Sequence, residues 1–123
     1  MIRVAVLIIS EEGVSGEYED ESGKIIADMV KKINGESVYL NTLDDEFRKI
    51  QEELFNLTEQ GIADLILTTG GTGFARRDVT PEATMAVIER ETPGIPEVMR
   101  WKAGQLTPKA ALTRARAGIR KSS

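Results

Sequence analysis

Three short apolar segments, separated by helical patterns, constrain the fold of this chain more than any other feature. The first, Ile2 to Ile9, is a nearly continuous run rich in Val and Ile. Such a run is typical of a strand that is buried on both faces, as in a parallel sheet. Ser37 to Leu43 and Ala63 to Thr69 predict a second and a third strand. A sheet of this kind needs cover on both faces, and the intervening segments must supply it.

The first predicted helix lies between the first two strands and begins near Ser22. Ser22 or Asp20 can cap it, and Gly35 stops it just after its last turn. Its apolar residues recur at helical spacing. They are Ile25, Ile26, Met29, Val30 and Ile33.

The second predicted helix follows the second strand, with Asp44 or Asp45 as its cap and Gly61 after its end. One face carries Phe47, Ile50, Leu54 and Leu57. Strands and helices thus alternate along the chain, and right-handed crossovers then give an α/β fold with helices on both faces of a parallel sheet.

The second half of the chain predicts two further helices. The third begins with Thr80 as its cap and Pro81 in its first turn, and it runs to about Arg90. TPGIP breaks the chain, and Pro96 opens a fourth helix. Residues 108–123 form a short amphipathic hairpin or a frayed end. No repeat or low-complexity linker interrupts the sequence, so one domain is expected.

The composition excludes several classes of function. The chain has 123 residues and a net charge of −4, so bulk charge does not direct it to nucleic acid or to anionic membranes. No apolar run approaches the ~20 residues of a membrane span. The absence of Cys permits a cytosolic location. Because His is also absent, any metal must have oxygen ligands, which favours Mg²⁺ over Zn²⁺.

The stretch TTGGTGFARRDVTPEAT, residues 68–84, carries the chemistry of a candidate site. It follows the third strand, and ligands of open parallel sheets bind outside the carboxyl ends of the strands. Glycines there let backbone N–H groups approach an anion, and the helix at Thr80 adds free N–H groups and a positive dipole end. Arg76 and Arg77 add planar donors that suit phosphate. The stretch therefore predicts a site for a phosphorylated ligand.

Asp78 within this stretch indicates a metal ion. A carboxylate repels a neighbouring phosphate unless a cation lies between them, and Mg²⁺ bridges carboxylate and phosphate oxygens. Asp45, after the second strand, is expected at the same edge of the sheet. Two such acids fit a phosphoryl- or nucleotidyl-transfer site. The alternative is a solvated turn in which Asp78 pairs with Arg76 or Arg77.

The same stretch closely resembles the signature of the molybdenum cofactor biosynthesis family that includes the MogA and MoaB proteins. The resemblance lies in TGGTG, residues 69–73, and RDVTPEA, residues 77–83. Other segments are similar to the family over essentially the full chain: DESG at residues 20–23, Asp45-Glu46, TPGIPEVMR at residues 92–100 and LTRARAG at residues 112–118.

The resemblance implies a fold and a reaction. Members of that family bind molybdopterin, a pterin with a dithiolene and a terminal phosphate. The enzymes among them transfer AMP from ATP to that phosphate with Mg²⁺ and release pyrophosphate. The same is expected here, on a three-layer α/β/α sandwich with a mostly parallel sheet, in a cytoplasmic homotrimer. The alternatives are a non-catalytic molybdopterin-binding or scaffolding member, and a nucleotide-hydrolysing relative, whose glycine loop usually leads into paired acids.

The resemblance also assigns roles to residues. Asp78 and Asp45 are the expected functional acids and the ligands of Mg²⁺. The expected substrate-binding residues are Thr69, Gly70, Gly71, Thr72, Gly73, Arg77, Thr80 and Ser22. Such a transfer needs neither His nor Cys, because positioning, Mg²⁺ and backbone donors can carry it.

Family members continue past the arginine-rich tail with another strand, a turn and a helix. One molybdopterin-binding domain over residues 1–123 that lacks this strand and helix is therefore expected, as a truncated chain or as a protein without that part. The acidic stretch from Glu11 to Glu21 is expected to be a lid or loop. Met99 and Trp101 are expected in the core or in a subunit contact. The tail cations either touch the ligand's phosphate or lie on a surface hairpin: Arg114, Arg116, Arg120 and Lys121.

Overall fold

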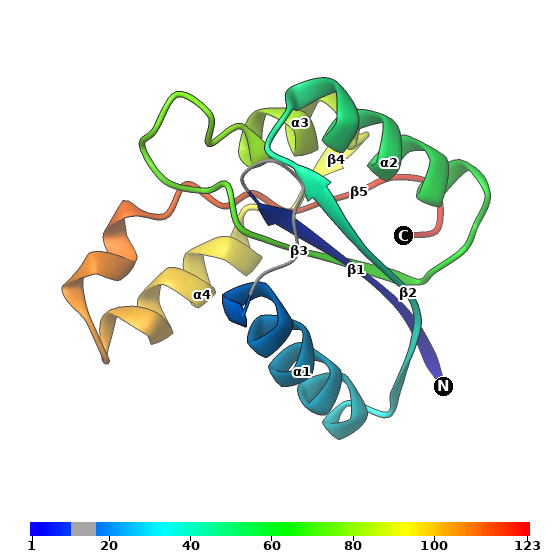
Figure 1. Cartoon of the computed structure of the whole chain (residues 1–123), viewed down its shortest axis with the longest axis horizontal. Coiled ribbons are helices and arrows are strands. Elements are labelled where there is room, and N and C mark those ends of the chain that lie inside the picture. The colour runs from blue at the N-terminus through cyan, green and yellow to red at the C-terminus, as the bar shows by residue number, and fades with distance from the viewer. Residues whose placement is uncertain (11–16) are drawn as a thin grey trace.

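The structure of the chain, a computed structural model, describes residues 1–10 and 17–123, with side chains in the first helix described from residue 21 onwards (Figure 1). Residues 11–16 of the predicted acidic loop lie outside the described residues, and the prediction is wrong for Glu17 to Glu21, which belong to the first helix. Within these ranges, every helix is too short or too polar to span a bilayer.

A three-stranded parallel sheet forms the centre of the molecule. Its strands are β1 (Ile2–Ser10), β2 (Gly35–Asp44) and β3 (Leu65–Thr69). β1 lies in the middle and pairs with β2 on one side and β3 on the other. Ser10 pairs with Asp44, and Ile8 pairs with Thr69. The carboxyl ends of all three strands therefore lie at one edge of the sheet.

Helices cover both faces of this sheet (Figure 1). They are α1 (Glu17–Lys32) on one face, and α2 (Phe47–Glu59) and α3 (Thr80–Val87) on the other. The side chains of β1 alternate between the two layers. Ala5, Leu7 and Ile9 pack with α2 and α3, whereas Val4, Val6 and Ile8 pack with Val30 of α1. The predicted three-layer α/β/α sandwich is thus confirmed.

The C-terminal part is ordered around a second, two-stranded sheet. Its elements are β4 (Arg90–Glu91), α4 (Gly94–Gly104), the 3-10 helix η2 (Pro108–Leu112) and β5 (Gly118–Ile119). β4 and β5 pair antiparallel. Arg120 follows β5, lies 4.6 Å from the centre of the Phe55 ring and is 2.8 Å from the carboxylate of Glu59. These contacts dock the tail on α2, so it is not a frayed end.

The predicted start and end of the first helix are wrong. α1 begins at Glu17, so Asp20 and Ser22 lie inside it and do not cap it. Acidic residues suit the first turn, because they interact favourably with the helix dipole, and the helix extends into them. After α1, Asn34 takes the left-handed conformation with φ of 57°. Gly35, the predicted stop, already belongs to β2.

The predicted caps of the next two helices are also wrong. Asp44 still belongs to β2, where it pairs with Ser10, so α2 starts only at Phe47, and neither Asp44 nor Asp45 caps it. Thr80 is the first residue of α3 and its cap position is occupied by Val79. β2 thus extends further than local propensity indicates, whereas α3 begins one residue earlier than predicted.

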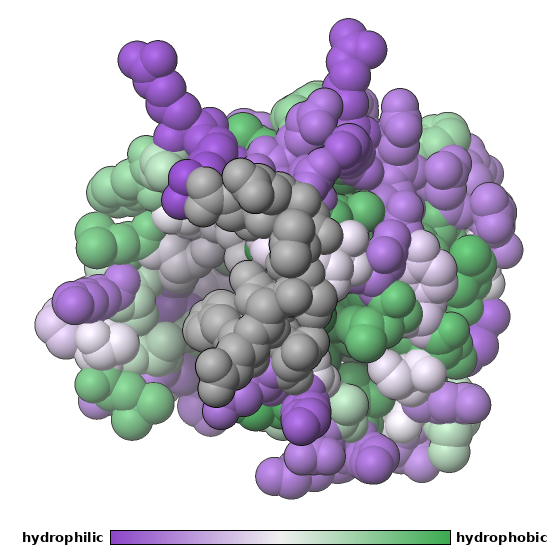
Figure 2. All heavy atoms as spheres, in the orientation of Figure 1, coloured by the Kyte–Doolittle hydropathy of each residue, from purple (hydrophilic) through white to green (hydrophobic). Residues whose placement is uncertain are grey.

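Several apolar side chains that were expected inside the molecule lie on its surface. Met99 and Trp101 of α4 are 59% and 67% exposed, so the prediction of a core position is wrong for both. Ile25 and Met29 of α1 are 59% exposed, whereas Ile26 packs against the sheet. Figure 2 shows such apolar side chains interspersed with polar ones on the face seen in Figure 1.

Candidate active site

Two described loops leave the carboxyl edge of the sheet: residues 45–46 after β2 and residues 70–79 after β3. An ion pair joins them, since Nε of Arg77 lies 3.5 Å from Oδ2 of Asp45. The side chain of Asp45 is only 20% exposed in this arrangement. The sheet therefore brings Asp45 to the glycine loop, as its position after the second strand predicted.

The glycine loop turns against the end of β1 in a shape that side chains do not allow. Gly70 and Gly71 have φ values of 98° and 71°. A Cβ on Gly70 would lie 2.3 Å from the backbone oxygen of Ile9, and one on Gly71 would lie 2.3 Å from Oγ1 of Thr80. Only glycine combines these φ values with such close approach. The packing of the loop against β1 and α3 therefore requires a turn without side chains at these two positions.

Thr80 stands at the junction of this loop and α3. Its N–H donates to the backbone oxygen of Gly71 at 3.1 Å. Its side chain is buried, and among the described residues Oγ1 has no hydrogen-bond partner. Buried hydroxyl groups are nearly always paired, so an unpaired one beside a bare glycine turn is a candidate ligand donor.

Asp78 closes the loop on itself. Its Oδ2 accepts a hydrogen bond from the backbone N–H of Ala75 at 3.0 Å, and its own N–H donates to the backbone oxygen of Ala75 at 3.0 Å. A Cβ on Gly73 would lie 2.8 Å from the same Oδ2. The Asp78 carboxylate therefore lies close against the glycine loop.

Asp45 and Asp78, in the loops at the carboxyl edge of the sheet, match in number and type the side chains that commonly bind Mg²⁺. The described residues contain no group of three or more acidic, His or Cys side chains that could hold a metal. Mg²⁺ commonly needs less from the protein, namely one or two carboxylates together with substrate phosphates and water. Asp45 and Asp78 can supply that set when a phosphorylated substrate is bound.

The remaining predicted site residues lie near the same edge with different surroundings. Thr69 ends β3, and the hydroxyl of Thr72 accepts a hydrogen bond from the hydroxyl of Thr113 at 3.1 Å. Ser22 is half-buried in α1. The substrate-binding roles of these three residues stay predictions.

Arg114, one of the four tail cations, contacts the glycine loop in a way that the sequence did not predict. Its Nε donates to the backbone oxygen of Gly73 at 2.7 Å, and Nη2 donates to the backbone oxygen of Asp78 at 2.7 Å. Nη1 lies 2.7 Å from the Glu82 carboxylate. The signal was the alternation of arginines in TRARAG, but alternation alone does not say which of them points to the loop.

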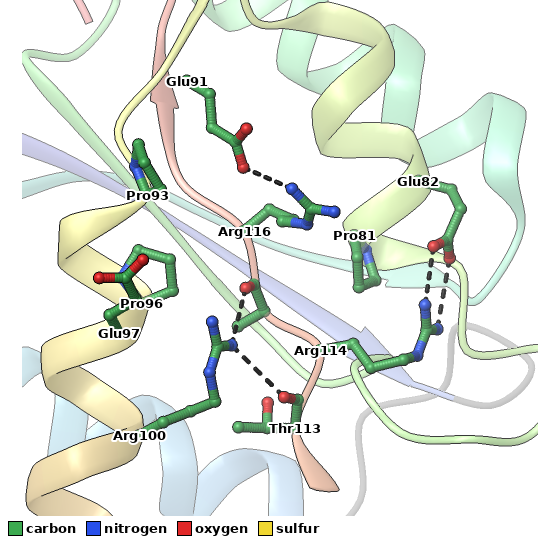
Figure 3. A pocket seen from close by; sticks show the side chains of 11 residues that line it. Pro81, Glu82, Glu91, Pro93, Pro96, Glu97, Arg100, Thr113, Arg114 and Arg116 are labelled. Carbon is green, nitrogen blue, oxygen red and sulfur yellow. Dashed lines mark hydrogen bonds and ion pairs between the residues drawn. The ribbon is translucent and has the colours of Figure 1, made fainter. Parts of the chain in front are cut away.

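A hollow of about 390 Å³, which Arg114 helps to line, lies between α3, α4 and residues 113–116 (Figure 3). Its other arginines already have partners. Arg116 is paired with Glu91, and Arg100 donates to the backbone oxygen of Ala115 at 3.1 Å. These contacts hold the tail against β4 and α4, and both arginines are engaged by the protein.

Low pH is expected to destabilise the protein, because it protonates carboxylates that form ion pairs between segments far apart in the sequence. Hydrogen bonds from Arg114, Lys121 and Arg3 lower the pKa of the Glu82, Glu59 and Asp64 carboxyls, respectively. Because the folded-state pKa values are lowered, this stability is present above the unfolded-state pKa values and is lost as the pH falls through the folded ones. Denaturant unfolding should show a loss of stability between about pH 5 and pH 2. The Glu82→Gln variant should lose less stability over this pH range than the parent protein. An equal loss of stability would show that Glu82 does not contribute to the acid effect.

The fold and loop define an α/β/α sandwich protein with a glycine loop at the carboxyl edge of its sheet. A family model described as "Probable molybdopterin binding domain" matches residues 5–121, and the chain belongs to that family. The chain is 40% identical to the molybdopterin adenylyltransferase of Helicobacter pylori over 99% of its own length and 70% of that protein's. It is 38% identical to the Escherichia coli protein of the same name, over 99% of this chain and 64% of that one.

Solved structures agree with these relatives. The molybdopterin biosynthesis enzyme MoaB from Thermus thermophilus superposes with a TM-score of 0.81 at 37% identity. The similarity covers 98% of this chain and 76% of the MoaB chain. The resemblance to the MogA and MoaB proteins is thus confirmed.

Proposed function

We propose that the chain is a molybdopterin adenylyltransferase of molybdenum cofactor biosynthesis. An oxygen of the terminal phosphate of molybdopterin attacks the α-phosphorus of ATP, and the bond to the β-phosphate oxygen breaks, which releases pyrophosphate. The observation that carries this proposal is the bare turn at Gly70 and Gly71, which ends at the buried, unpaired hydroxyl of Thr80. Family membership supports molybdopterin as the substrate, and the glycine turn beside α3 supports a site for its phosphate.

The residues of the site can support the proposed transfer of AMP without His or Cys. The bare backbone of the loop and the N-terminus of α3 bind phosphate oxygens as preorganised donors. Arg77, which is 57% exposed beside Asp45, is placed to approach a bound phosphate. Holding two phosphates in line is itself a large part of catalysis in phosphoryl transfer.

Asp45 and Asp78 are the residues that would hold Mg²⁺. When bound, the ion neutralises phosphate charge that the two carboxylates would otherwise repel. The hydrogen bond from Ala75 fixes Oδ2 of Asp78, which keeps this carboxylate at the loop before any ligand arrives.

We propose a homotrimer in the cytoplasm. Exposed apolar side chains support a subunit contact, among them Met99 and Trp101 on α4. Mass measurement by light scattering should give three times the chain mass at micromolar concentration, and a monomeric mass would count against the trimer.

Pyrophosphate release tests the reaction directly. Incubation of the protein with intact molybdopterin, ATP and Mg²⁺ should yield pyrophosphate and adenylylated molybdopterin in equal amounts. The reaction should stop when molybdopterin or Mg²⁺ is left out. Tight molybdopterin binding without turnover would instead identify a non-catalytic binding member of the family, and release of phosphate from ATP without molybdopterin would indicate a hydrolase.

A further inference from the structure

Arg114 reaches the glycine loop from a part of the chain far away in sequence. It follows η2, yet it contacts both ends of the loop and the first turn of α3. Figure 3 shows its guanidinium facing the carboxylate of Glu82. Its backbone N–H also donates to the backbone oxygen of Thr72 at 2.9 Å. One residue therefore joins four points of the candidate site.

The guanidinium of Arg114 is already engaged by the protein. A guanidinium has five N–H donors in a rigid fork. Four hydrogen bonds occupy the fork: Nε to Gly73, Nη2 to Asp78 and to Glu82, and Nη1 to Glu82. The side chain is only 35% exposed. Such an arginine has little left to offer a phosphate.

We infer that Arg114 is a positioning residue: it fixes both ends of the glycine loop and thereby holds Asp78 in place. The inference rests on the proposed adenylyl transfer for its catalytic consequence. Asp78 is held from two sides, by Ala75 within the loop and by Arg114 from outside. Glu82 neutralises the guanidinium and fixes its plane, so that its other donors meet the two backbone oxygens. The tail thus sets the geometry of the loop without touching substrate.

Substitution of Arg114 by lysine distinguishes a positioning role from a role of positive charge alone. The Lys ammonium is a point charge that can pair with Glu82 but cannot reach all three acceptors in fixed directions. Arg114→Lys is therefore expected to keep the fold and the ion pair, yet to lose the hold on Gly73 and Asp78. Arg116→Ala is the matched control, since Arg116 is two residues away and pairs with Glu91 instead.

Hydrogen–deuterium exchange of residues 70–80 tests the inference without substrate. The N–H groups of Ala75, Asp78 and Thr80 are hydrogen-bonded within the loop region. In Arg114→Ala and Arg114→Lys these amides should exchange roughly tenfold faster than in the parent protein, because local opening becomes easier. Arg116→Ala should leave their exchange unchanged. If Arg114→Ala does not fold, the lysine variant still decides the question.

Kinetics supply the second readout. Arg114→Lys should lower kcat for AMP transfer by on the order of 10²-fold, as displaced reacting groups do, while KM for ATP changes little. The inference would be overturned if the amides of residues 70–80 exchanged as slowly in Arg114→Ala or in Arg114→Lys as in the parent protein. It would also be overturned if Arg116→Ala increased their exchange as much as the Arg114 variants do. If the parent protein transfers no AMP, the proposed function fails, but the exchange comparison still tests the positioning role.

Discussion

Asp78→Asn is expected to lower the rate of AMP transfer by at least about 100-fold, since a preorganised charge in such a site contributes roughly 10²–10³ in kcat. The variant is informative because Asn keeps an oxygen that can accept the hydrogen bond from Ala75. The loop should therefore retain its shape while the carboxylate charge is lost. Pyrophosphate release at saturating ATP and molybdopterin measures the effect.

A matched variant controls for the loss of one acid. Asp64→Asn makes the same chemical change just before β3, at the opposite edge of the sheet, where Asp64 pairs with Arg3. Its rate should equal that of the parent protein. Unchanged activity in Asp78→Asn would show that Asp78 does not act in the transfer. An equal loss of activity in both variants would show that the net charge of the protein, and not the position of Asp78, causes the effect.

Gly70→Ala is expected to destabilise the fold by about 3 kcal/mol, through strain at positive φ and overpacking. The added Cβ would lie 2.3 Å from the backbone oxygen of Ile9, so β1 and the loop would have to move apart. The melting temperature should fall by roughly 10 °C. Molybdopterin binding should weaken as well, since the displaced backbone is the expected anion site.

Gly104→Ala is the control for this change. A Cβ on Gly104 meets nothing within 4 Å, and its φ is not positive. Within α4 the substitution should leave the melting temperature equal or slightly higher, because alanine favours helix. A Gly70→Ala protein as stable as the parent would mean that the loop does not pack against Ile9 as described.

The central layers of the fold could be predicted because their signal is local. The apolar run of β1 and the spacing of Ile50, Leu54 and Leu57 on α2 correspond to buried positions in the structure. The helix ends could not be predicted in this way. Asp44 is a good cap by type, but pairing with Ser10 keeps it in β2, and only the assembled sheet decides that.

In the candidate site, too, features encoded by neighbouring residues could be predicted, whereas contacts between residues far apart in the sequence could not. The glycine turn and its position at a strand end follow from a contiguous motif. Arg114 meets the loop only because β5 pairs with β4 and the tail docks on α2, and no spacing rule encodes that. The exposure of Trp101 was missed for a related reason, since helical spacing gives a face but not what covers it.

The order of the strands has a consequence for how the chain folds. β1 is made first along the chain, but its partner β3 begins only at Leu65, about half the chain later. Such distant parallel pairing is slow, because the intervening chain must close a long loop before contacts form. The fit of Gly70 against Ile9 exists only once β3 has docked. The proposed phosphate binding should therefore require the complete sheet, and a ligand that binds there should raise the unfolding midpoint by stabilising the folded state.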